Sequence, residues 1–130
     1  MSDATGAVQA ALVTALRAGL GERVSGVFDG PPPRAALPYA AIAETVTTDW
    51  SAKGMAGREH RLAVAIWDEG GRPARIHALM ALAEAAIEGM AADLGAHRLV
   101  GMLFLRARLI RDTNGPWAGL MEYRARTVRA

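Results

Sequence analysis

Apolar residues near the N-terminus recur at every third or fourth position, which is the spacing of one face of a helix. The members of this stripe are Val8, Ala11, Leu12, Ala15, Leu16 and Leu20. Ser2 or Asp3 can cap the first turn through a side-chain oxygen, and Gly19 and Gly21 suit the end of a helix. We therefore predict an amphipathic helix over roughly the first 20 residues.

Alternation of apolar and polar residues predicts three strands in the next segment, over residues 24–28, 39–46 and 59–67. In the third strand, the even-numbered apolar residues share one face of the expected sheet. Three consecutive prolines, at 31–33, follow the first strand. Because proline cannot donate to a strand ladder, this run is expected to form a rigid extended connection.

A second helical stripe follows the Gly70-Gly71 pair, which breaks the chain after the third strand. Its members are Ile76, Leu79, Met80, Ala83, Ile87 and Met90. Pro73 suits the first turn of this helix, and Gly95 is its expected end.

The last third of the chain predicts a long hairpin, with strands over 99–111 and 117–128 joined through an Asn-Gly turn. We expect one uninterrupted register, in which Leu109 lies opposite Met121 and Leu103 opposite Thr127. A slip of one residue would place arginines on the apolar face, and it is therefore disfavoured.

The predicted order of elements is α-β-β-β-α-β-β. Sequential strands with two amphipathic helices indicate an α+β fold, with a single antiparallel sheet of about four to five strands and both helices on one face. The length of 130 residues favours one domain over the whole chain, 1–130.

Composition narrows the class of protein further. Hydrophobic residues make up 52% of the chain, which argues against disorder. The absence of cysteine excludes disulfides, thiolate catalysis and cysteine-ligated zinc. The sequence shows no signal peptide and no apolar run of about 18 residues, so we expect synthesis in the bacterial cytoplasm and no membrane partner.

No arrangement of polar residues predicts catalysis. His60, His77 and His97 lack the spacing of a metal site, and they are interpreted as isolated surface or edge residues. Glu84 and Glu88 are four residues apart on the outer face of a helix, as solvated charges commonly are. We therefore predict neither an enzyme nor a bound metal or cofactor.

Four arginines of the C-terminal hairpin share the face opposite the apolar one: Arg106, Arg108, Arg124 and Arg126. In the expected register Arg106 opposes Arg124, and such a pair repels modestly. This cost suggests that the face meets carboxylates of a neighbour or phosphates. The alternative is a solvated face, on which Arg108 and Glu122 form a weak exposed pair.

A second candidate site is the segment 47–57, which is too long for a tight hairpin and holds two glycines. Its tryptophan has no obvious burial site within the chain, and a docked tryptophan is typical of an interface anchor. The residues expected at this interface are Asp49, Trp50, Lys53, Met55 and Arg58. In the alternative, the loop folds back and Trp50 covers the protein's own core.

Four segments in this order resemble a family of small phage tail-completion proteins, long catalogued as a domain of unknown function, with members in gene transfer agents of alphaproteobacteria. They are VFDGPP at 27–32, LPYAAIAE at 37–44, DWS at 49–51 and GREHRL at 57–62. The second helix and the final hairpin fit the same layout, so the resemblance covers nearly the whole chain.

The resemblance implies a structural virion protein, a tail terminator. Such a subunit forms a hexameric ring at the capsid-proximal end of the tail tube, halts tube polymerisation and docks to the head–tail connector. Its partners would be its own copies, the major tail tube protein and the connector protein. If the arginine face lined the lumen, six copies would place roughly two dozen positive charges around passing DNA, which they would contact without sequence specificity.

Two other readings remain open. A head-completion or connector protein would share the size and the partners of a terminator. A free-standing nucleic-acid-binding domain would use the arginine face, but Phe104 is the only aromatic residue there that could stack on bases.

Overall fold

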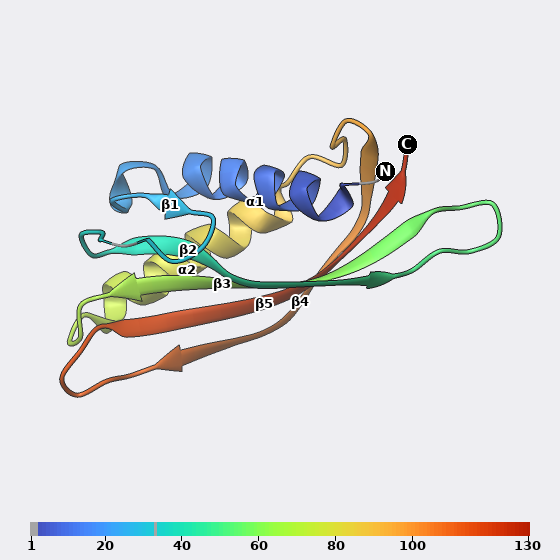
Figure 1. The fold of residues 1–130 in the computed structure, drawn as a ribbon. Helices are drawn as coiled ribbons and strands as arrows, with labels where there is room; N and C mark the ends of the chain where they lie inside the picture. The colour runs from blue at the N-terminus through green and yellow to red at the C-terminus, as the bar shows by residue number, and fades with distance from the viewer. Residues whose placement is uncertain (1–2, 33) are drawn as a thin grey trace.

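The computed structural model describes residues 3–32 and 34–130. Two helices and five strands follow the predicted order, so the α+β fold class is confirmed (Figure 1). In chain order the elements are α1 (Ala4–Leu20), a short 3-10 helix η1 (Gly21–Arg23), β1 (Val27–Phe28), β2 (Tyr39–Asp49), β3 (Gly57–Asp68), α2 (Pro73–Glu88), β4 (His97–Ile110) and β5 (Trp117–Arg129).

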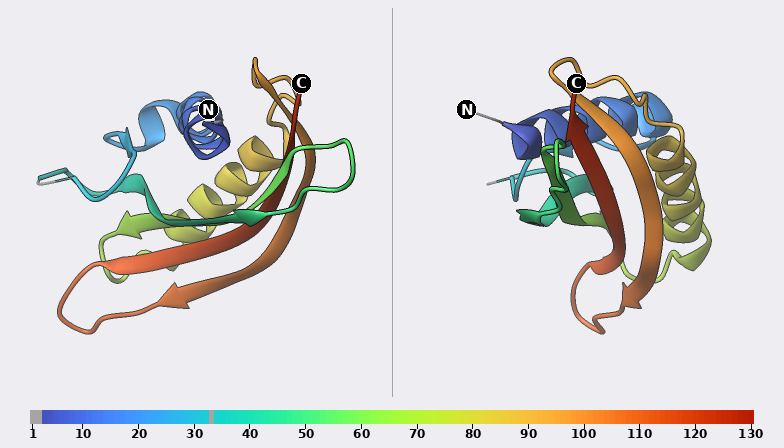
Figure 2. Two further views of the ribbon diagram at one scale, coloured as in Figure 1. Left: turned by 45° about the vertical axis from the view of Figure 1, so that its right-hand side comes forward. Right: turned by 90° about the vertical axis from the view of Figure 1, so that its right-hand side faces the viewer.

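The strands form one sheet in the order β1-β2-β3-β5-β4. β1 pairs with β2 in parallel, while all other pairs are antiparallel, so the sheet is mixed rather than wholly antiparallel. β5 is inserted between β3 and β4, which leaves β4 at an edge. Both helices lie on the same side of the sheet (Figure 2), and we call the other side the open face.

α1 begins and ends as its sequence indicates. The Asp3 side chain accepts a hydrogen bond from the Gly6 backbone N–H at 3.0 Å and so caps the first turn. Ser2, the alternative cap, and Pro33, the last proline of the run, lie outside the described residues. Gly21 has a φ of 55° at the C-cap.

Gly19 has a packing role and does not end α1. A Cβ atom at this position would lie 2.6 Å from the Cβ of Ala86 on α2, so the missing side chain allows the two helices to approach closely.

α2 begins at Pro73 as predicted but ends at Glu88, about two turns before Gly95. Gly89 is its C-cap, and the Gly89 N–H donates to the carbonyl oxygen of Ala85 at 3.0 Å. Glycine is the poorest helix former after proline, which explains the early end. Gly95, with a φ of 84°, instead turns the chain into β4.

The hydrophobic core lies between the two helices and the sheet. Both predicted stripes contribute to it, together with the even-numbered apolar residues of β3 and alternate residues of β5. The largest fully buried apolar side chains are Leu12, Leu16, Leu20, Leu62, Ile66, Ile76, Ile87, Met121 and Tyr123.

The end of β3 is tied to the start of α2 by Asp68, whose side chain is fully buried. Arg75 donates from Nε to Asp68 Oδ2 at 2.8 Å and from Nη2 to Asp68 Oδ1, and the Glu69 N–H donates to Oδ1 at 2.7 Å. Burial disfavours the charged carboxylate, but these hydrogen bonds outweigh it and hold the pKa of Asp68 below its usual value.

We expect Asp68→Asn to lower the free energy of unfolding by about 1–2 kcal/mol, because the amide cannot accept all of these hydrogen bonds. Urea denaturation at neutral pH measures the change. Glu69→Gln removes an exposed carboxylate next to Asp68 and serves as the control, with an effect within about 0.5 kcal/mol. An equal effect of both substitutions would contradict this role of Asp68.

The predicted register of the C-terminal hairpin is wrong. Leu103 lies opposite Arg124, where Thr127 was expected, and Leu109 lies opposite Gly119, where Met121 was expected. The pairing shifts twice, between Leu99 and Gly101 and again between Phe104 and Arg106. A bulge adds one unpaired residue to one strand, so no single register can describe the whole hairpin.

Candidate functional site

The open face carries a band of charged residues across β3, β5 and β4. Residues directly opposite each other on neighbouring strands point to the same side of a sheet. The register therefore places three cross-strand pairs on this face: Glu59 with Arg126, Arg61 with Arg124, and Glu122 with Arg106. The band connects the predicted arginine face to Glu122 and to Glu59 of β3, and Glu59 is a partner that the sequence did not reveal.

Most of the predicted arginine face is paired with glutamates. The Arg106 Nε donates to a carboxylate oxygen of Glu122. Arg126 and Arg124 converge on one oxygen of Glu59, at Nε–Oε1 distances of 3.0 and 3.8 Å. The face is thus an ion-pair network across strands, not a row of unmatched cations.

Because the bulges shift the register, two contacts on this face differ from those expected. The partner of Glu122 is Arg106 and not Arg108. The hydrogen bond from Arg106, helped by the charge of Arg108, holds the pKa of Glu122 below its usual value. Arg106 does not oppose Arg124; Arg61 does, so a like-charged pair exists on this face with a different member.

The candidate loop is shorter than predicted, because β2 continues to Asp49 and β3 already begins at Gly57. The Trp50 N–H donates to the Gly57 carbonyl at 3.0 Å. Asp49 and Arg58 form an ion pair at 3.2 Å. The Arg126 guanidinium lies 4.7 Å from the Trp50 ring centroid, which is a cation–π contact. Trp50 therefore has a partner within the chain, and the two candidate sites meet at this contact.

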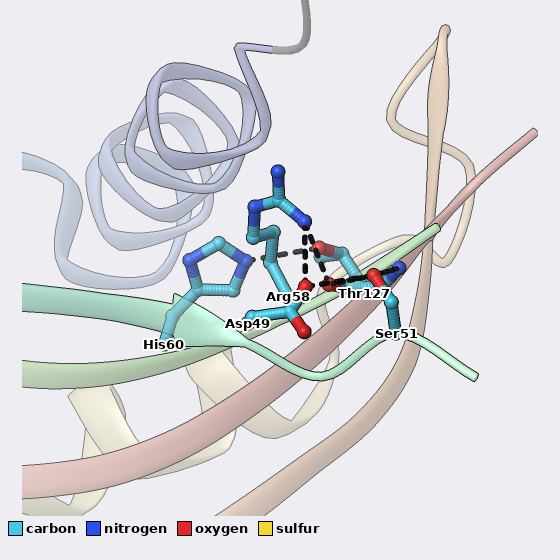
Figure 3. A network of polar contacts seen from close by, with 6 residues as sticks. Asp49, Ser51, Arg58, His60 and Thr127 are labelled. Atoms are coloured by element: carbon cyan, nitrogen blue, oxygen red, sulfur yellow. Dashed lines mark hydrogen bonds and ion pairs between the residues drawn. The ribbon is translucent and has the colours of Figure 1, made fainter. Parts of the chain in front are cut away.

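The tip of the loop is closed by its own hydrogen bonds. Ala52 and Met55 exchange two backbone hydrogen bonds, of 3.0 and 2.9 Å, around Gly54, which has a φ of 77°. Lys53 is exposed at this tip. Ser51 donates to Asp49 at 2.7 Å and accepts from the Gly57 N–H at 3.1 Å (Figure 3). Of the predicted interface residues, Asp49 and Arg58 are thus brought together, while Lys53 and Met55 lie at the tip.

A chain of partly and fully buried polar side chains joins α1 to three strands. Thr5 Oγ1 lies 2.7 Å from Thr47 Oγ1, Thr47 Oγ1 lies 2.9 Å from His60 Nδ1, and His60 Nε2 lies 2.9 Å from Thr127 Oγ1. Figure 3 shows the imidazole of His60 joined to Thr127 on the helix side of the sheet. The interpretation of His60 as a surface or edge residue is therefore wrong, since its exposure is 0%.

The other two histidines differ from each other. His77 is exposed on α2, as predicted, whereas His97 is buried, which the sequence interpretation did not expect. No group of three or more potential metal ligands comes together within residues 3–32 and 34–130. In the same part of the chain, no helix has both the length and the apolar character needed to cross a membrane.

Burial lowers the pKa of His60 below its usual 6.5, and the nearby His97 and Arg58 lower it further. In the unfolded chain His60 binds its proton more readily than in the folded protein. Titration of His60 should therefore leave the free energy of unfolding unchanged above pH 6.5. Below pH 6.5 the free energy of unfolding should decrease as the pH falls towards the folded-state pKa of His60.

The dependence of stability on pH is measured from the midpoints of urea denaturation between about pH 7.5 and about pH 5.5. His60→Asn should flatten it, because the titrating group is gone, and His77→Asn should leave it as in the wild type. An unchanged slope in His60→Asn would show that another group is responsible.

Comparison with known proteins identifies one family, and two of the similar solved structures are described here. The family described as "Tail completion protein gp17" matches residues 6–128. A chain in the virion of a native gene transfer agent particle is 29% identical, with a TM-score of 0.79 over 98% of this chain and 99% of that chain. The gp17 protein of bacteriophage SPP1 is 21% identical, with a TM-score of 0.64 over 95% of this chain and 91% of that chain, a likeness of fold. A search of curated proteins found no match.

Proposed function

The chain belongs to the tail completion protein gp17 family, and is thus a structural, non-enzymatic component of a virion tail; on this premise we propose that it is the tail terminator. In this role its copies form a ring, a hexamer, at the capsid-proximal end of the tail tube. The ring stops tube polymerisation and then joins the tail to the head. Its partners are its own copies, the major tail tube protein and the head–tail connector protein.

The observation that carries this proposal is the extent of the match. The family match spans residues 6–128, and the chain from the gene transfer agent particle is covered over 99% of its length. The likeness therefore extends over the whole unit and is not limited to one motif. Identical copies that contact each other head to tail close into a ring when the rotation between them divides a full turn.

Deleting the gene in the strain that makes the particle tests the proposal. We expect tails that lack heads and whose tubes vary widely in length, because nothing stops the addition of tube subunits. Electron micrographs measure both properties, and the wild-type gene supplied in trans should restore them. Headless tails of normal length would instead support a head-completion or connector protein. Complete particles with normal tails would contradict both roles.

We further propose that the open face lines the lumen of the ring and contacts passing DNA through its phosphates. The central rows of this face hold five arginines and three glutamates: Arg61, Arg106, Arg108, Arg124, Arg126, Glu44, Glu59 and Glu122. Six copies would then present roughly a dozen net positive charges, about half of the two dozen expected from the four hairpin arginines alone. Such a lumen attracts the DNA backbone without reading its sequence.

Arg61 and Arg124 are suited to test this proposal, because they lie in the middle of the sheet, away from its edges. Replacing both with glutamine should leave particles intact in electron micrographs but reduce DNA delivery. His77→Gln, on the exposed side of α2, is the control and should deliver DNA normally. Normal delivery by the double variant would reject the lumen role of this face.

A further inference from the structure

Every large apolar side chain that is strongly exposed among the described residues lies on β2 or β4. Val46 of β2 is 45% exposed, and Val100, Leu103, Phe104 and Ile110 of β4 are between 40% and 48% exposed. Exposed apolar residues gathered on particular elements mark an interaction surface. Four of these five side chains lie on β4, while Val46 lies on β2, near the other side of the sheet.

The outer edge of β4 is free over most of its length. Its first residues are covered, because the Leu99 N–H donates to the Ala92 carbonyl at 2.8 Å and the Leu94 N–H donates to the His97 carbonyl at 2.9 Å. From Gly101 to Ile110, no described residue pairs with this edge. Of the features that commonly protect such an edge, this segment has two arginines and the bulge between Phe104 and Arg106, and it has no lysine or proline.

The outer edge of β2 is free over its second half. β1 pairs only with Ala40 and Ala41. From Glu44 to Asp49, no described strand lies on the outer side of β2. The sheet of one copy therefore ends in two unsatisfied edges, with four exposed apolar side chains on β4 and one, Val46, on β2.

The two free edges carry opposite charges. The free part of β2 contains Glu44 and Asp49 and no basic residue, while the free part of β4 contains Arg106 and Arg108 and no acidic residue. Glu44 forms no ion pair with any residue that the structure describes. Complementary charge favours contact between a β2 edge and a β4 edge, and it disfavours contact between two β4 edges.

The strand directions also fit. β2, β3, β5 and β4 alternate in direction across the sheet, so β2 and β4 run in opposite directions. When copies are placed side by side by rotation, β4 of one copy meets β2 of the next in the antiparallel sense. The alternation of the sheet then continues across the junction, and each junction removes two free edges.

We propose that neighbouring copies of this chain pair through these edges, β4 of one copy with β2 of the next, so that one sheet runs around the ring. The contact is heterologous, as a ring requires, and the occupant of each edge is a second copy of the chain. This inference rests on the proposed function, because it assigns the surfaces through which that ring would close.

Engineered cysteines can test the contact without interference, since the chain has none of its own. Val46 points to the open face, because it lies opposite Arg61. Val46→Cys is combined in turn with a cysteine at each open-face position of the free β4 edge. These positions are Gly101, Leu103, Arg106, Arg108 and Ile110. Paired strands lie about 4.7–5.5 Å apart, within the range of Cα distances of about 4.4–6.8 Å that a disulfide bridges.

Particles carrying each variant are purified, oxidised and analysed on non-reducing gels. We expect one or two neighbouring double variants to give a ladder of covalent multimers, and Val46→Cys alone to give only monomer. The matched control combines Val46→Cys with Ala18→Cys, an exposed position on α1, and should also stay monomeric. Dimers from Val46→Cys alone would mean that β2 edges meet each other, which overturns the inference.

Electron microscopy of the same particles separates the two proposals. If a ring of this protein is present but no double variant forms a ladder, the edge contact is wrong and the terminator role stands. If wild-type particles contain no such ring, the proposed function fails and the edge contact fails with it.

Discussion

Replacing His60 with alanine is expected to lower the free energy of unfolding by about 3–5 kcal/mol. The substitution empties a site with 0% exposure, so it leaves a cavity in the core. It also leaves the hydroxyl groups of Thr47 and Thr127 without the hydrogen bonds that His60 supplies at 2.9 Å. Both effects act at the place where α1 is joined to the sheet through Thr5.

Chemical denaturation of the purified protein measures this loss. His77→Ala removes the same side chain from an exposed position on α2 and should change the free energy of unfolding by less than about 0.5 kcal/mol. Thr127→Val should lower the free energy of unfolding by less than His60→Ala does, because it breaks one hydrogen bond and keeps the volume of the side chain. If His60→Ala and His77→Ala had equal effects, the network would not contribute to stability.

Gly57→Ala should lower the free energy of unfolding by about 2–3 kcal/mol, although it adds only one methyl group. A Cβ atom at Gly57 would lie 2.6 Å from the carbonyl oxygen of Trp50, which belongs to the backbone and cannot rotate away. The hydrogen bond from the Trp50 N–H to Gly57 closes the loop, so the clash should also separate Trp50 from Arg126.

Gly101→Ala is the matched control, because a Cβ atom at that strand position would meet no heavy atom within 4 Å. Thermal unfolding compares the two variants, and tryptophan fluorescence reports the release of the Trp50 ring. A Tm of Gly57→Ala equal to that of Gly101→Ala would contradict the predicted clash.

The sequence alone was sufficient for the features that depend on neighbouring residues. The helical stripe from Val8 to Leu20, the cap at Asp3 and the proline at the start of α2 are all local signals, and the structure confirms each. The alternation in β3 likewise placed its even-numbered apolar residues on one face, which the structure shows to be the buried one. The end of α2 was misplaced because two glycines, Gly89 and Gly95, compete to end the helix, and the first one does.

The pairing of distant strands could not be predicted in the same way. No local signal in the hairpin indicates that β3 lies on the other side of β5, so Glu59 was not connected to the arginines, and Glu122 was paired with Arg108 where the structure has Arg106. Gly101, at the first shift in β4, is a residue typical of bulges, but the second shift, between Phe104 and Arg106, leaves no such mark in the sequence. The expected register therefore failed at the positions that decide which charges meet.

Two site assignments failed for related reasons. The contact of Trp50 with Arg126 joins residues of β5 and of the β2–β3 loop, and no spacing rule connects them. The burial of His60 was available from the sequence, because it shares the alternation of Leu62 and Val64 on the face that is buried. Its polarity led to the wrong interpretation, since a histidine can be buried when both ring nitrogens have partners.

The position of β5 inside the sheet has a consequence for how the protein is made. β5 is the one strand that pairs with β4 and one of the two that pair with β3, yet residues 117–129 leave the ribosome after both of them. The larger part of the sheet therefore forms only once translation has reached these residues, and its contacts connect distant parts of the chain. β4 can therefore take its place at the edge of the sheet only after β5 has been synthesised.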